Sequence, residues 1–204
     1  MSLEWIVFAV FLMIACTQVI RWVGLEQKRT ASWTAMAGPL GLTYEKGDLA
    51  GELDGLPVRI FRESGERMGD KRMNESVYVV QVEVPAKLPR GFVAAPRRWT
   101  SLSERLLSPN VFKAAEPVLD EAYIFQSDDV EPGQKLLQEP DVQQALCDLV
   151  NPDSVSFVRG RHVGLAYRNH TFVEDADKVR RNLMLLARTA RALAQAQERL
   201  RSAA

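Results

Sequence analysis

The fold of this chain is indicated by residues 48–61, Asp48-Leu-Ala-Gly-Glu-Leu-Asp-Gly-Leu-Pro-Val-Arg-Ile-Phe61. Apolar residues alternate with other residues on both sides of Asp54-Gly55, and a period of two is typical of a half-buried strand. Asp and Gly both tolerate the positive φ angles that a two-residue hairpin turn requires. The stretch therefore predicts a β-hairpin, whose apolar residues are Leu49 and Leu53 before the turn and Val58 and Ile60 after it.

Strands are also predicted on both sides of this hairpin. Gly41-Leu-Thr-Tyr44 precedes it, and Ser76-Val-Tyr-Val-Val-Gln-Val-Glu-Val84 follows it as the clearest strand of the chain. In that strand alternate residues share a face, so Tyr78 and the even-numbered valines form one apolar surface. Residues 63–75 are charged and contain two glycines, which predicts an exposed loop. Together these elements predict a meander of three or more antiparallel strands.

The second half of the chain mixes helices with a second hairpin. We expect irregular structure over 90–117 with a short helix over 99–107, and then a short strand over 121–126. Residues 132–150 read as a helix that Pro140 can divide in two. Residues 155–157 and 163–167 flank Arg159-Gly-Arg161 as two short strands. The predicted fold class is α+β, with antiparallel hairpins packed against helices.

The chain is expected to end in a long helix over 174–201. Acidic residues stand at its start and arginines at its end, and both oppose the helix macrodipole favourably. Apolar residues spaced four and three apart form a stripe along it: Val179, Leu183, Leu186, Ala190, Leu193 and Leu200. Such a stripe predicts docking on the sheet. Self-association, or binding to acidic lipid through the basic residues, stays open as an alternative.

The N-terminal stretch Trp5-Ile-Val-Phe-Ala-Val-Phe-Leu-Met-Ile-Ala-Cys-Thr-Gln-Val-Ile-Arg-Trp-Val23 predicts a membrane span. About 19 residues at ~1.5 Å each reach ~28 Å, close to the thickness of a hydrocarbon core. Trp5 and Trp22 mark its two ends, where indoles favour the headgroup region, and Arg21 can extend its side chain outward. We expect a membrane anchor over 1–25, a juxtamembrane segment over 26–40 and one domain over 41–204.

Charges beside this span predict its orientation. Arg21, Lys28 and Arg29 follow it and only Glu4 precedes it, so the domain should face the cytoplasm. A cleaved signal peptide is disfavoured because no basic residue precedes the apolar run. Cys16 follows a small residue and leaves a lipoprotein anchored at Cys16 as an alternative.

Residues suited to catalysis or metal binding do not gather in a recognised pattern. His162 and His170 are eight apart without an accompanying Cys, whereas zinc needs three or four convergent ligands. Asp128, Asp129 and Glu131 could bind a cation, but helix capping by Asp129 or a neighbour is the favoured interpretation. No metal ion or cofactor is therefore expected.

Nucleophilic and phosphate-binding motifs are missing as well. The sequence has no Gly-x-Ser-x-Gly and no glycine-rich loop between a strand and a helix. Cys147 lies near the apolar face of a predicted helix, where a thiol is inert. The sequence does not decide whether the chain is an enzyme, but the missing motifs favour a non-enzymatic protein.

Arg97-Arg98-Trp99 is the strongest surface candidate. Two guanidinium groups beside an indole could contact lipid headgroups or other anions. The formal net charge of the 204-residue chain is zero, which argues against a dedicated nucleic-acid binder. Arg97, Arg98 and Trp99 are therefore predicted as an anion or lipid contact.

One part of the chain resembles a known group of proteins. Trp33, Gly41-Leu-Thr-Tyr44 and Leu49-Ala-Gly-Glu-Leu-Asp-Gly-Leu-Pro-Val58 are similar to a pattern in uncharacterised bacterial single-pass membrane proteins. The resemblance covers about residues 30–60. It implies a bacterial source and a domain of unknown function, and it brings no catalytic residues.

The function expected from all this is a membrane-anchored, non-enzymatic interaction or scaffolding domain at the bacterial inner membrane. Its partners would be the bilayer through residues 5–23 and a protein or second copy through the 174–201 helix, without nucleic acid. Two alternatives remain. One is an enzyme whose site is assembled from distant residues such as Asp128, Asp129, Arg161 and His162. The other is a lipid-binding or oligomerising module that uses the basic last helix.

Overall fold

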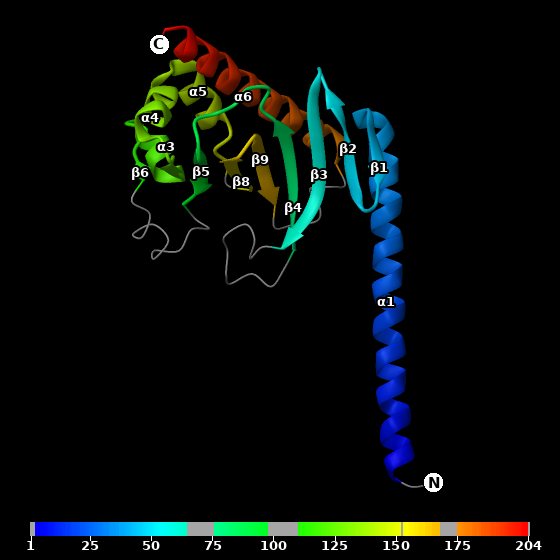
Figure 1. Ribbon diagram of the computed structural model, residues 1–204. Helices are drawn as coiled ribbons and strands as arrows, with labels where there is room; N and C mark the ends of the chain where they lie inside the picture. The colour runs from blue at the N-terminus through cyan, green and yellow to red at the C-terminus, as the bar shows by residue number, and fades with distance from the viewer. Residues whose placement is uncertain (1–2, 65–75, 98–109, 152, 168–174, 204) are drawn as a thin grey trace.

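An antiparallel sheet with helices on one side is the main feature of the computed structural model, which describes residues 3–64, 76–97, 110–151, 153–167 and 175–203 (Figure 1). The described residues form a nine-stranded sheet of order β1-β2-β3-β4-β9-β8-β5-β7-β6. Every neighbouring pair in it is antiparallel. The predicted α+β class with an antiparallel sheet and a long C-terminal helix is confirmed.

The first half of the sheet is the predicted meander. It consists of β1 (Leu42–Glu45), β2 (Asp48–Leu53), β3 (Leu56–Ser64) and β4 (Ser76–Glu83). The predicted hairpin turn is confirmed, because Asp54 and Gly55 connect β2 to β3 with φ angles of 50° and 78°. The predicted 63–75 loop lies almost wholly outside the described residues.

The second half contains more strands than the sequence predicts. Its elements are β5 (Val93–Pro96), β6 (Val111–Phe112), α3 (Pro117–Ala122), β7 (Tyr123–Gln126), α4 (Val130–Gln138), α5 (Pro140–Asp148), β8 (Val155–Arg159) and β9 (His162–Tyr167). Pro140 does divide the predicted helix, since it opens α5. The expectation of irregular structure over 90–117 was wrong for β5 and β6, which the sheet holds through pairing with β7. The helix expected over 99–107 lies outside the described residues.

The last helix, α6 (Ala176–Ser202), packs across the sheet. Its predicted stripe lies in the core, where Val179, Leu183, Leu186, Ala190 and Leu193 are buried. These side chains share one hydrophobic cluster with the even-numbered valines of β4. Docking on the sheet is therefore confirmed as the use of the stripe. The Asp175 side chain caps the helix by accepting a hydrogen bond of 2.9 Å from the Lys178 amide.

A second, smaller cluster lies on the other face of the sheet. It contains Val77, Val79, Phe157 and Ala166, all of them on strands. The ring of Phe157 crosses Gly164, where an added Cβ would come within 2.4 Å of that ring. The absence of a side chain at Gly164 therefore allows the two strands to pack with the aromatic ring lying over the backbone.

The first helix, α1 (Leu3–Leu40), is continuous and has two different environments. Its last turns belong to the core, with Trp33, Met36, Ala37 and Leu40 buried in the same cluster as the sheet. Pro39 lies in the last turn, and the helix ends one residue later, where Gly41 has a φ of 69° and donates to the Gly38 carbonyl at 3.0 Å. The packed unit thus includes part of the predicted juxtamembrane segment.

The preceding turns of α1 project away from the sheet (Figure 1). Within the described part of the chain, no helix meets the length and hydropathy of a membrane span.

Candidate functional site

The projecting part of α1 carries a concentration of exposed apolar side chains. Leu12, Met13, Val19 and Ile20 are each more than half exposed, and Val23 is 39% exposed. Isolated exposed apolar residues are ordinary, but a contiguous group of them marks an interaction surface. The predicted span residues Trp5, Arg21 and Trp22 lie along the same helix. Cys16 is exposed on it as a free thiol.

The predicted Arg97-Arg98-Trp99 contact is described only in part. A guanidinium nitrogen of Arg97 donates to the carbonyls of Asp120 at 2.8 Å and Tyr123 at 3.4 Å. Part of the donor capacity of Arg97 is therefore used to hold α3 and β7 beside β5. Arg98 and Trp99 lie outside the described residues.

The residues of the enzymatic alternative are not brought together. His162 opens β9 and lines a pocket of about 370 Å³, in which Glu63 is the one carboxylate among the described lining residues. Asp128 and Asp129 follow β7, which is three strands from β9 in the sheet order. With strands about 4.8 Å apart, that separation is on the order of 14 Å. Arg161 forms an ion pair of 2.9 Å with Glu83.

The acidic residues before α4 have other contacts. Asp128 forms an ion pair with Arg90 at 3.5 Å, and Glu131 pairs with Lys135 at 2.7 Å. The hydrogen bond from Lys135 lowers the pKa of the Glu131 carboxyl. Asp129 occupies the predicted N-cap position of α4, although its side chain makes no capping hydrogen bond. A metal-binding group of His, Cys, Asp or Glu is not found among the described residues.

The thiol of Cys147 is poorly suited to nucleophilic chemistry. Cys147 lies on α5 and is partly buried. Burial is the main cause that raises the pKa of its thiol, and nearby Glu116 and Asp148 raise it further. A raised pKa lowers the thiolate fraction, and the thiolate is the reactive form.

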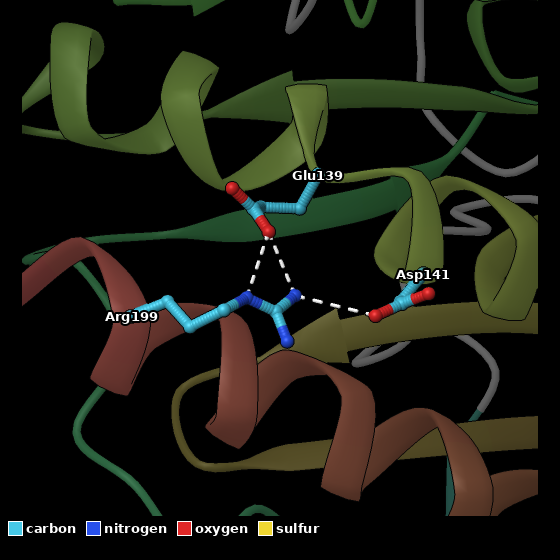
Figure 2. Close-up of polar contacts among 3 residues, drawn as sticks. All are labelled: Glu139, Asp141 and Arg199. Atoms are coloured by element: carbon cyan, nitrogen blue, oxygen red, sulfur yellow. Dashed lines mark hydrogen bonds and ion pairs between the residues drawn. The ribbon is translucent and has the colours of Figure 1, made fainter.

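Arginines of α6 bind other parts of the same chain. Figure 2 shows Arg199 between Glu139 and Asp141 at the α4–α5 junction, with distances of 2.7 and 3.3 Å. Hydrogen bonding to Glu139 raises the pKa of the Arg199 guanidinium. Four more arginines reach the rest of the domain: Arg180 donates to the Pro39 carbonyl, Arg188 pairs with Asp148, Arg191 with Asp54, and Arg201 donates to the Lys87 carbonyl. Much of the basic face of α6 is thus used within the domain.

A cleft of about 550 Å³ lies beside the ends of strands β5 and β8. Residues from both strands line it together with the end of α3 and the segment after α5: Pro96, Arg97, Val118, Glu121, Ala122, Val150, Asn151, Ser154, Val155 and Ser156. We call it the β5–β8 cleft. The two strands pair only at Val93↔Arg159 and Ala94↔Val158, although β8 begins at Val155. The cleft lies beyond the paired residues of these two strands.

Two buried serines, Ser154 and Ser156, line this cleft. Ser154 and Ser156 are both 6% exposed. The hydroxyls of Ser156 and Tyr123 hydrogen-bond each other, and the Tyr123 hydroxyl also donates to the Leu146 carbonyl at 3.4 Å. Burial is the main cause that raises the pKa of Tyr123 to about 12. The tyrosine stays protonated at neutral pH and acts here as a hydrogen-bonding strut between β7, α5 and β8.

This cleft is not evident from the amino-acid sequence. Its one sequence signal is Pro96, because a proline inside a sheet marks an edge or an interruption of pairing. Reading that signal requires the register between β5 and β8, which the local pattern does not contain. A comparison of the chain with protein-family models, curated proteins and solved structures found no match.

Proposed function

We propose that this chain is a membrane-anchored, non-enzymatic interaction domain, held in the bilayer by the N-terminal part of α1. One observation carries the proposal. The same helix has large apolar side chains exposed at Leu12, Met13, Val19 and Ile20, and has Trp33 buried in the core of the domain. The apolar residues thus lie on a rigid extension of the folded unit and lack a covering layer within the described chain.

A bilayer is the partner that fits this extension best. No charged residue occurs from Trp5 to Ile20, so the segment has no polar stripe to face water. Its length from Trp5 to Val23, about 28 Å, matches a hydrocarbon core. Arg21, Lys28 and Arg29 favour a cytoplasmic domain, and the resemblance of residues 30–60 favours a bacterial inner membrane.

The helix between the membrane and the domain would act as a spacer. From Val23 to Trp33 the chain stays helical, which corresponds to a rise of about 15 Å. The sheet and its clefts would therefore stand clear of the lipid headgroups, where a second protein can reach them. This placement supports an interaction role.

The two alternatives, an enzyme and a lipid-binding or oligomerising module that uses α6, are less well supported. The pocket beside His162 has one carboxylate among its described lining residues, and Asp128 and Asp129 are distant from it. The apolar stripe of α6 is buried, and five of its arginines contact the same chain. We therefore assign the interaction role to the rest of the domain surface.

Membrane extraction tests the anchor. The full chain is expressed in a bacterium, and membranes are washed with alkaline carbonate. The wild type should stay in the pellet, and Leu12→Arg should move to the supernatant, because an arginine at mid-span disfavours insertion by about 2.5–3.5 kcal/mol. Met184→Arg is the matched control, since Met184 on α6 is 61% exposed, close to the 55% of Leu12. Release of the wild type by carbonate would refute the proposal.

Cys16→Ser separates the two kinds of anchor. A helical span should keep this variant in the pellet with an unprocessed N-terminus by intact mass. Loss of the variant from the membrane, or a lipid-modified Cys16 in the wild type, would replace the helix by a lipoprotein anchor.

A further inference from the structure

We propose that α1 pairs with the α1 of a second copy of this chain, parallel to it, along one face of the helix. The inference rests on the proposed membrane anchor and names a partner for it. Five residues, alternately three and four positions apart, define the face: Met13, Cys16, Ile20, Val23 and Gln27. We call them the α1 seam. This spacing is the heptad repeat with which two helices pack along each other in a coiled coil.

Every residue of the α1 seam is exposed. Met13 and Ile20 are 63% and 69% exposed, and Val23 is 39% exposed. Cys16 and Gln27 are exposed as well. The seam carries no charge, although four charged residues lie between positions 21 and 29 of the same helix. An uncharged face thus continues past Val23, beyond the predicted span, where lipid tails no longer cover it.

The folded domain leaves the α1 seam free. Met36, which is buried in the core, follows Gln27 by nine residues, and nine residues are two and a half turns of an α-helix. Met36 therefore points to the side of α1 opposite Gln27. The sheet begins with β1 beside α1 and continues away from the helix (Figure 1). A second helix can lie along the seam, with the two domains on opposite sides of the helix pair.

A shared membrane makes a second copy the partner that fits this face. Two chains anchored in one membrane have the same orientation, so their helices are parallel and a twofold axis along the membrane normal relates them. On such an axis each seam residue lies against the same residue of the second copy. Gln27 is self-complementary there, because its amide can donate one hydrogen bond to the other Gln27 and accept one in return. A polar residue at such a position fixes the register of a helix pair.

Cysteine cross-linking in membranes tests the geometry. The full chain is expressed in a bacterium, its membranes are oxidised with copper phenanthroline, and disulfide-linked dimer is measured on a non-reducing gel. The wild type should cross-link, because Cys16 meets its own copy at the seam. Cys16→Ser measures any cross-linking through Cys147. Cys16→Ser/Ile20→Cys should restore the dimer from a second position of the seam.

Cys16→Ser/Gln18→Cys is the matched control. Gln18 is exposed and lies about 3 Å along the helix axis from Cys16, so its depth in the membrane is similar. It precedes Gln27 by nine residues, which places it on the side of the helix opposite the seam. This variant should lose the cross-linked dimer, because two cysteines on the far sides of a helix pair are too distant to form a disulfide.

Charge exchange at Gln27 tests the pairing without altering the span. Gln27→Glu and Gln27→Lys each place two like charges against each other, which at about 4 Å in water should raise the dissociation constant of the dimer about fivefold. Sedimentation equilibrium of the full chain in density-matched micelles measures this constant. An equimolar mixture of the two variants should regain the wild-type affinity, since opposite charges then meet. Both variants should stay in the carbonate-washed pellet.

Four results would overturn the inference. They are a wild type that is monomeric at every protein-to-micelle ratio, equal cross-linking from Cys16 and from Gln18→Cys, a mixture of the two Gln27 variants that dimerises no better than either alone, and a cross-link from Cys16 to a different protein, which would make that protein the partner. Carbonate extraction reports separately on the anchor. A wild type that stays in the pellet as a monomer refutes the pairing alone, and one that carbonate releases but that cross-links in buffer refutes the anchor alone.

Discussion

Replacing Trp33 with alanine tests whether the last turns of α1 belong to the folded domain. The indole is 2% exposed, and its ring centre lies 6.4 Å from that of Tyr44 and 6.1 Å from that of Tyr78. The predicted domain boundary at residue 41 would leave this side chain outside the folded unit. The structure places it between α1 and the first strands of the sheet.

The expected loss follows from the buried area. An indole buries about 150–250 Å², which at about 25 cal/mol per Å² corresponds to about 4–6 kcal/mol as an upper bound. Measured Trp→Ala substitutions in cores lose about 3–5 kcal/mol, and we expect Trp33→Ala to fall in that range. Because a domain is stable by about 5–15 kcal/mol in total, the variant should be close to unfolding.

Urea unfolding of the full chain in detergent micelles, followed by far-UV circular dichroism, measures this loss. Ile20→Ala is the control on the same helix, because Ile20 is 69% exposed and should change stability by less than about 0.5 kcal/mol. Trp33→Phe should lose less than Trp33→Ala. A loss below about 1 kcal/mol for Trp33→Ala, or equal losses at Trp33 and Ile20, would refute the assignment of these turns to the core.

Three further predictions concern the domain itself. Burial raises the pKa of Tyr123 and Tyr167 to about 12, above the usual 10. Their contribution to stability is therefore complete below pH 10 and lost as the pH rises toward 12. Absorbance at 295 nm, which follows tyrosine ionisation, and circular dichroism, which follows unfolding, should change together at alkaline pH. Gly164→Ala should lower the free energy of unfolding by about 1–3 kcal/mol because the new Cβ meets the Phe157 ring. In a double-mutant cycle, the same substitution should cost less in the Phe157→Ala background than in the wild type, and additive effects would contradict the contact. Arg199→Met should lower the stability to urea only slightly, and by less in 1 M salt than in 0.1 M; a loss that does not depend on salt would contradict a solvent-exposed ion pair.

Local patterns predict the elements whose residues agree with their surroundings. The Asp54-Gly55 turn, the alternation in β4 and the stripe of α6 each follow from residues close in sequence, and each is present. Pro140 likewise divides a helix as its missing N–H requires. For these elements the local sequence is sufficient to predict the structure.

Elements held by distant partners are different. β5 consists of Val-Ala-Ala-Pro, a sequence with weak strand propensity, and it forms a strand because β7 and β8 pair with it. The buried odd-numbered residues of β4, Val77 and Val79, depend on Phe157 and Ala166 from the last hairpin. The β5–β8 cleft depends on the same long-range register. A pattern read along the chain contains none of these relations.

The pairing of β4 with β9 also sets an order on folding during synthesis. Both strands lie near the middle of the sheet, yet about 80 residues separate them, so at about 5–20 residues per second the ribosome needs roughly 4–16 s to deliver the partner of β4. Until then the meander has an unpaired edge that carries valines on both faces, and such edges pair readily with other chains. α1 emerges before the sheet and, on the proposed function, fixes each nascent chain to its own place on the membrane. The anchor would thereby keep neighbouring nascent chains apart during the interval in which their open edges are most prone to aggregate.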